Sequence, residues 1–211
     1  MAELLDEFAK RYVDPLMKEA GFKRLRTRRW WLPSPEGNAA FVQFRAYPMD
    51  PRIAFHVEAS GIPRVLREYY EGGSAVKPPK FDGGFVRTRQ AAPPDRGPAS
   101  HLGGHVWDFL PDTMDEYGPQ AQDYLRAVAI PQWKSFLDPA GLLMAAHGGP
   151  SRDFAVVGGY GLEFSQVILR VDDGNPEVLE AMIEGLLLKR ADPKLLEWLR
   201  QRVRDRAEGR R

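Results

Sequence analysis

Residues 53–60 alternate strictly between two kinds of side chain, and this pattern constrains the fold more than any other stretch. One set is apolar and consists of Ile53, Phe55, Val57 and Ala59. The other set is mostly polar and consists of Ala54, His56, Glu58 and Ser60. Because successive side chains of a strand point to opposite faces, the alternation predicts a strand with one packed face and one polar face.

Two further strands are predicted just before it, over 27–32 and 39–47. Clusters of turn-forming residues separate the three strands, PSPEGN at 33–38 and PMDP at 48–51. Connections this short join antiparallel neighbours, whereas parallel strands need a long crossover. The stretch from 21 to 62 therefore predicts an antiparallel meander.

An amphipathic helix precedes the meander. Apolar residues recur at helical spacing from Leu4 to Met17, which predicts a helix with one buried face, and Gly21 marks its end. Pro15 interrupts the pattern, so either the helix kinks there or a second helix begins with Asp14 as its cap. The apolar face of the sheet gives this helix a surface on which to pack.

A segment rich in glycine and proline, 72–104, follows the meander, and its irregular composition predicts a long loop or insertion. A fourth strand is expected at 105–110. Helical periodicity then returns over about 115–136 and again over 139–146. The segment 153–171 is ambiguous, because two parts of it suit a strand.

Two capped helices close the chain. They begin after Asn175 and Asp192, each followed by a proline at the first helical position, and their short connection predicts an αα-hairpin. The last turns are rich in arginine from Arg200 onward, which suits the negative end of the helix dipole.

These patterns together predict an α+β fold. An antiparallel sheet of about four strands is packed by the N-terminal helix and is followed by a helical C-terminal half that ends in the αα-hairpin. We expect an α+β domain over 1–150, with its Pro/Gly-rich loop at about 72–104. A helical extension over 151–211 is expected to pack on this domain as one structural unit.

Cysteine is absent from the 211 residues, which excludes disulfides, thiolate nucleophiles and cysteine-bound zinc. The formal net charge is +1, so no global field attracts nucleic acid or membrane. No apolar run approaches the roughly 20 residues that span a bilayer, and acidic residues interrupt the N-terminus early, unlike a signal peptide. We therefore expect a cytoplasmic protein without a membrane segment, whose oligomeric state is open.

Several short motifs resemble a bacterial family of unknown function. That family begins with an amphipathic helix, a Gly-Phe-Lys step, an aromatic strand, a glutamine-bearing strand and a third strand that ends in Gly-Ile. The matching residues here are Pro15-Leu16, Gly21-Phe22-Lys23, Trp30-Trp31, Gln43, Phe55-His56-Val57, Gly61-Ile62 and Ala129-Ile130-Pro131-Gln132-Trp133. The resemblance covers about 3–62 and 105–137. It implies an α+β fold with an antiparallel sheet and brings no known catalytic residues.

Two patterns suggest chemistry. His56 and Glu58 share the polar face of one strand and could act as a general base and its partner, although a solvated or helix-covered face explains the same pattern. His101, His105 and Asp108 have a spacing seen in metal sites. Because glycines lie between the two histidines, the helix on which they would converge is disfavoured. We expect no metal and no cofactor.

The basic, aromatic stretch 23–31 is a candidate binding surface. Arg26, Arg28 and Trp30 interleave cations with a ring, as in proteins that bind single-stranded nucleic acid, and Gln43 and Arg45 extend this surface. In the alternative interpretation, one tryptophan packs in the core and the arginines pair with surface acids.

The leading functional hypothesis is a non-enzymatic module that binds a protein partner or a ligand, using the polar sheet face or the loop at 72–104. Two alternatives stay open. One is a nucleic-acid binder through 23–31, and the other is a hydrolase-type enzyme that uses His56 and Glu58.

Overall fold

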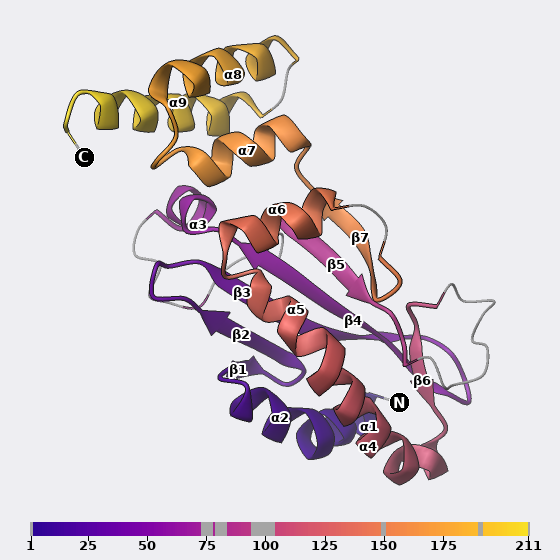
Figure 1. Cartoon of the computed structure of the whole chain (residues 1–211). Helices are drawn as coiled ribbons and strands as arrows, with labels where there is room; N and C mark the ends of the chain where they lie inside the picture. The colour runs from indigo at the N-terminus through magenta and orange to yellow at the C-terminus, as the bar shows by residue number, and fades with distance from the viewer. Residues whose placement is uncertain are drawn as a thin grey trace.

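The computed structural model describes residues 2–72, 78, 84–93, 104–148, 151–189 and 192–210. Over these residues the fold is α+β, with an N-terminal helix, an antiparallel sheet and a helical C-terminal half (Figure 1). The predicted class is confirmed. The predicted size of the sheet is wrong, since the described part of the chain contributes seven strands instead of about four.

The N-terminal helix continues through its proline by widening one turn. It consists of α1 (Ala2–Phe8), the π-helical turn η1 (Ala9–Val13) and α2 (Asp14–Glu19). The Asp14 N–H donates to the carbonyl of Ala9, five residues back. Proline has no N–H and clashes with the preceding turn, so a wider turn before Pro15 relieves both problems. Of the two predicted alternatives, the structure has one helix with a distortion.

The sheet is antiparallel throughout. Its strands are β1 (Lys23–Arg26), β2 (Arg29–Pro33), β3 (Ala39–Tyr47), β4 (Ile53–Ile62), β5 (Val86–Gln90), β6 (Trp107–Phe109) and β7 (Phe154–Gly159). They run in the order β1-β2-β3-β4-β5-β7, and β6 also pairs with β4. The predicted meander corresponds to β2, β3 and β4, where Phe41 lies opposite Trp31 on one side and Ser60 on the other.

Two strands were missed for identifiable reasons, and a third lies in a segment whose structure was left open. The basic stretch before Trp30 contains a hairpin, in which Arg28 takes the left-handed turn conformation (φ 63°) between β1 and β2. Strand β5 lies inside the segment 72–104 that was predicted to be a loop. Strand β7 and helix α7 (Leu162–Arg170) divide the ambiguous segment 153–171 between them. Since β7 belongs to the sheet, the sheet extends beyond residue 150, and the helical C-terminal part of the chain begins with α7.

A layer of helices covers the apolar face of the sheet. In Figure 1, α5 (Ile130–Ser135) and α6 (Pro139–His147) lie in front of the strands, and α4 (Met114–Tyr124) lies beside the N-terminal helix. A second π-helical turn, η4 (Leu125–Ala129), separates α4 from α5 just before a proline, as η1 does in the first helix. The core between the layers includes the fully buried aromatic residues Phe8, Trp30, Phe55, Trp107 and Trp133.

Helices α8 (Pro176–Leu188) and α9 (Pro193–Ala207) form the predicted αα-hairpin, which lies with α7 beyond one end of the sheet (Figure 1). Both predicted caps are confirmed, because Asn175 accepts from the Val178 N–H and Asp192 from the Leu195 N–H, each at 3.2 Å. The hairpin also meets α3 (Arg64–Glu71), where the rings of Tyr69 and Trp198 are 5.4 Å apart.

Among the helices in the described part of the chain, none combines the length and the apolar character that a membrane crossing requires.

Candidate functional site

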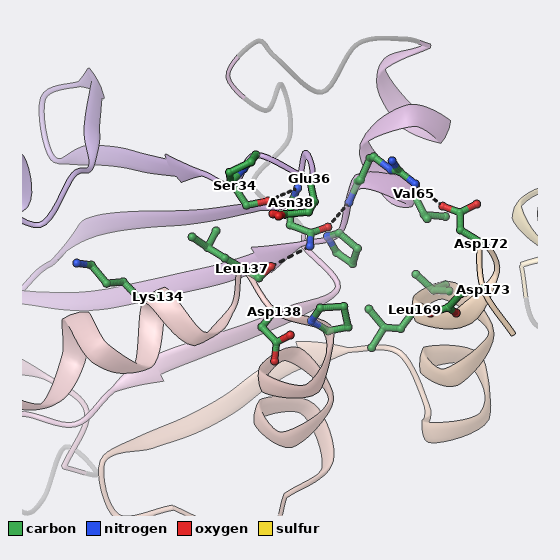
Figure 2. Close-up of a pocket in the computed structure, with 15 residues that line it drawn as sticks. Ser34, Glu36, Asn38, Val65, Lys134, Leu137, Asp138, Leu169, Asp172 and Asp173 are labelled. Carbon is green, nitrogen blue, oxygen red and sulfur yellow. Dashed lines mark hydrogen bonds and ion pairs between the residues drawn. The ribbon is translucent and has the colours of Figure 1, made fainter.

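A cleft of about 710 Å³ opens where four connecting segments meet (Figure 2). These segments are the β2–β3 turn, the start of α3, the α5–α6 turn and the C-terminal end of α7. We call it the Arg64 cleft. The residues that line it are Ser34, Pro35, Glu36, Asn38, Pro63, Arg64, Val65, Lys134, Leu137, Asp138, Pro139, Ile168, Leu169, Asp172 and Asp173.

Asn38 holds three walls of the Arg64 cleft together. Its Oδ1 accepts a hydrogen bond from the backbone N–H of Arg64 at 2.8 Å, and its Nδ2 donates to the carbonyl of Leu137 at 2.8 Å. The hydroxyl of Ser34 accepts from the Asn38 N–H at 3.1 Å and closes the turn. Figure 2 shows the bonds to Arg64 and Leu137 at the Asn38 side chain and the third bond at its backbone. A single asparagine therefore fixes the turn, the helix start and the α5–α6 connection.

A network of ion pairs forms the far wall. Arg64 Nη2 lies 2.6 Å from Asp172 Oδ2, and Arg202 of α9 contacts the same carboxylate at 2.5 and 2.6 Å and also pairs with Glu68. Burial raises the pKa of Asp172, but hydrogen bonds from Arg202 and Arg64 outweigh it, so the pKa falls below its usual value. Arg64 also lines two smaller clefts, of about 360 and 450 Å³, so it borders these two as well as the Arg64 cleft.

The lining of the Arg64 cleft combines apolar walls with an acidic rim. The apolar part consists of Pro63, Val65, Leu137, Pro139, Ile168 and Leu169. Around it, Glu36, Asp138, Asp173 and Lys134 are exposed. Glu36 and Asp173 form no ion pair with any residue that the structure describes, and Asp138 caps α6 by accepting from the Gly141 N–H. The rim therefore carries carboxylates whose charge is uncompensated.

A second cluster lies on the polar face of the sheet and contains several residues singled out from the sequence. Glu58 is 2% exposed. Its carboxylate accepts from Gln43 Nε2 at 3.1 Å and from Arg89 Nη2 at 2.9 Å, and Arg45 Nη1 lies 3.4 Å away. We call these four residues with His56 the Glu58 cluster. Arg89 was missed because it lies in the segment predicted as a loop, although the alternation VRTRQ could have indicated a strand.

Charges in the Glu58 cluster shift the pKa values of its titratable groups. Burial raises the pKa of Glu58, but hydrogen bonds from Arg89 and Gln43 and the charge of Arg45 bring it below its usual value. Burial lowers the pKa of His56, and the charges of Arg89 and Arg45 lower it further. His56 is thus neutral at pH 7, and its Nδ1 lies 3.1 Å from the carbonyl of His105. Since both oxygens of Glu58 already have donors, it is poorly placed to act as a base.

Replacing Glu58 by glutamine tests this electrostatic arrangement. The folded-state pKa of Glu58 lies below its usual value of 4.5, so the ionised carboxylate stabilises the fold above about pH 4.5 and the gain is lost as pH falls through the folded-state pKa. We expect Glu58→Gln to cost about 1.5–3 kcal/mol in the free energy of unfolding at pH 7, and the cost to shrink towards pH 3. Urea unfolding at several pH values measures this cost, and Glu116→Gln at an exposed position is the control. A cost that stays constant down to pH 3 would contradict a lowered pKa of Glu58.

The basic stretch 23–31 is tied into the fold. Trp30 is 1% exposed, and its indole Nε1 donates to Asp14 at 2.8 Å. Arg28 pairs with Asp6 at 2.8 Å, whereas Arg26 is exposed and has no ion pair with a described residue. The ring of Trp30 is therefore not accessible for stacking on a base, and the structure does not bring Arg26 or Arg28 to the Glu58 cluster.

The candidate metal ligands are only partly described. His101 lies outside the described residues. Asp108 is 8% exposed and forms an ion pair with Arg52, so its carboxylate already has a cationic partner. Burial, followed by the charge of Arg89, lowers the pKa of His105. Over the described residues, no group of three or more histidine, aspartate or glutamate side chains is placed to hold a metal ion.

Sequence reasoning missed the Arg64 cleft. Asn38 and Arg64 are 26 residues apart, and Arg64 and Asp172 are 108 apart. Each of these residues has an ordinary local explanation in a turn or at a helix end, and no short-range pattern connects them. No protein-family model, no curated protein and no solved structure matches the chain, so its function is inferred from the geometry of these sites.

Proposed function

We propose that the chain is a non-enzymatic binding module that takes a segment of a partner protein into the Arg64 cleft. The segment would present an apolar side chain next to a lysine or arginine. The observation that carries this proposal is the combination of apolar walls with exposed, unpaired carboxylates on one cleft.

Charge selects the partner. The positive charge of Arg64 is neutralised within the cleft by Asp172, at 2.6 Å. On the rim, Glu36, Asp138 and Asp173 face a single exposed cation, Lys134. The rim is therefore net negative, and a cationic segment is favoured because opposite charges steer association and fix its register. The apolar walls supply the burial that an interface needs at its centre.

Catalysis finds less support in the same cleft. Its lining residues include one hydroxyl, that of Ser34, which accepts a hydrogen bond within the turn, and they include no histidine. A nucleophile needs a base within hydrogen-bond reach. We therefore place the function in binding, and as part of this proposal we retain a cytoplasmic location and the relationship to the bacterial family of unknown function.

Synthetic hexapeptides test the cleft directly. Peptides that place arginine beside leucine or proline are expected to bind the full chain, whereas matched peptides with glutamate for arginine are not. The double variant Glu36→Gln with Asp173→Asn should weaken binding about three- to thirtyfold, since each exposed ion pair contributes about 0.3–1 kcal/mol. Fluorescence anisotropy of labelled peptides gives the dissociation constants.

The control is a second pair of exposed carboxylates with the same charge change. Glu116→Gln with Glu184→Gln alters α4 and α8, away from the Arg64 cleft, and should leave peptide affinity unchanged. Equal weakening by both double variants would mean that only global charge matters. Binding of arginine and glutamate peptides with the same affinity would also refute the proposal.

A further inference from the structure

The polar face of the sheet carries a local excess of positive charge, although the formal net charge of the chain is only +1. Arg45 on β3 and Arg89 on β5 both approach the carboxylate of Glu58. Arg87 stands two residues before Arg89, so it projects from the same face, and the register places it opposite Ser60 as Arg89 is opposite Glu58. Two guanidinium groups thus contact one carboxylate, and the third, that of Arg87, lies beside them on the same face, over Gly158 of β7.

Most hydrogen-bond donors of these arginines remain unused. A guanidinium has five N–H donors, yet Arg45 and Arg89 each use one nitrogen on Glu58. Arg87 forms no hydrogen bond or ion pair with any residue that the structure describes. Its Nε and that of Arg89 are buried without a partner, and buried donors of this kind call for an acceptor, such as a bound ion.

These arginines are also accessible from solvent. The guanidinium of Arg87 lies over Gly158 of β7. A Cβ added at Gly158 would lie 3.8 Å from Arg87 Nη2. The side chains of Arg45 and Arg89 are 57% and 31% exposed. An anion from solvent therefore reaches the guanidinium groups of Arg45 and Arg89, which Glu58 holds in place, and Arg87 beside them is partly exposed.

Charge identifies the class of anion. Burial and the neighbouring arginines keep the pKa of His56 and of His105 low, so both imidazoles are neutral at pH 7. Three guanidinium groups against one carboxylate then leave two positive charges uncompensated. A phosphate monoester carries about −1.5 to −2 at this pH and accepts bidentate bonds from arginine.

We propose that an isolated phosphate group, carried by a small molecule, binds among Arg45, Arg87 and Arg89 on the polar face of the sheet. This site shares no residue with the Arg64 cleft. A nucleic-acid strand is disfavoured because Trp31 and Phe41 on this face are each 4% exposed, which leaves Tyr47, at 36%, as a single exposed ring beside the described part of the site. A strand that stacks successive bases needs several such rings.

Titration of the full chain with inorganic phosphate tests the site, with chloride at equal ionic strength as the reference. The Nε–Hε signals of Arg87 and Arg89 in NMR spectra should shift and saturate with phosphate but not with chloride. This measurement needs no variant. Replacement Arg87→Ala should weaken phosphate binding about tenfold, the loss of roughly one charged hydrogen bond, while circular dichroism confirms that the variant is folded.

The matched control is Arg26→Ala, which removes the same charge from an exposed position on β1 and should leave phosphate affinity unchanged. Shifts that do not saturate, or equal weakening in both variants, would overturn the proposal. If single-stranded DNA competed with phosphate and bound more tightly per phosphate group, the site would instead be a surface that binds a nucleic-acid strand.

Discussion

Replacing Arg202 by alanine is expected to lower the free energy of unfolding by about 3–5 kcal/mol. Arg202 is 5% exposed, and its guanidinium contacts both oxygens of Asp172 and the carboxylate of Glu68. Its removal takes a cation away from two partly buried carboxylates, both of which Arg64 also contacts. Breaking a buried pair on one side is costly because the partner charge stays in a poorly solvated place. Urea denaturation followed by circular dichroism measures the change.

A surface arginine on the same helix provides the control. Arg204 is 53% exposed and pairs with Glu180 at 2.9 Å, so Arg204→Ala should cost no more than about 1 kcal/mol. If Arg202→Ala proved as mild as Arg204→Ala, the network would be no more than a surface ion pair. A loss confined to Arg202 would identify it as the attachment of the C-terminal hairpin to α3 and α7.

This role of Arg202 was not visible in the sequence. The arginine-rich end of α9 was explained there by the helix dipole, which suits the exposed Arg204 but does not account for a buried guanidinium. The pattern along one helix indicates which face is apolar. It does not indicate that a cation on that face will meet Asp172 and Glu68, which lie 30 and 134 residues away. Partners so distant are determined by tertiary packing.

The same distinction between local and distant contacts explains which parts of the fold were predictable. The β2–β4 meander and the caps at Asn175 and Asp192 depend on neighbours within a few residues, and their predictions are confirmed. Strand β5 pairs with β4 and β7 across long connections, and a loop-like composition surrounds it. Its alternation is short and partly charged, so the surrounding glycine and proline dominated the prediction.

The candidate sites follow this rule as well. Gln43, Arg45, His56 and Glu58 were recognised because they lie on two strands whose register follows from a short turn. Arg89 completes that cluster from a strand that was not predicted. The Arg64 cleft lies entirely in connections and helix ends, where glycine, proline and capping residues have sufficient structural explanations of their own. A cleft of this kind becomes visible only when the connections are placed side by side.

The second prediction with a large expected effect concerns the hydrophobic core. Replacing Trp133 by alanine should lower the free energy of unfolding by about 3–5 kcal/mol, because a fully buried aromatic side chain is lost and a cavity remains. Trp133 is 0% exposed, and its ring packs edge-on against Phe22 with centroids 6.2 Å apart. The residue therefore joins α5 to the segment between the N-terminal helix and β1. Chemical denaturation measures this loss.

A pair of milder substitutions separates volume from hydrogen bonding. Trp30 and Trp133 are both buried, but Nε1 of Trp30 donates to Asp14, whereas Nε1 of Trp133 has no hydrogen-bond partner among the residues that the structure describes. Trp30→Phe should therefore cost about 1–3 kcal/mol more than Trp133→Phe, since it leaves an acceptor unpaired while the other change removes an unsatisfied donor. Equal costs for the two phenylalanine variants would show that the Trp30–Asp14 bond contributes nothing to stability, and a costlier Trp133→Phe would mean that its indole nitrogen has a bound partner.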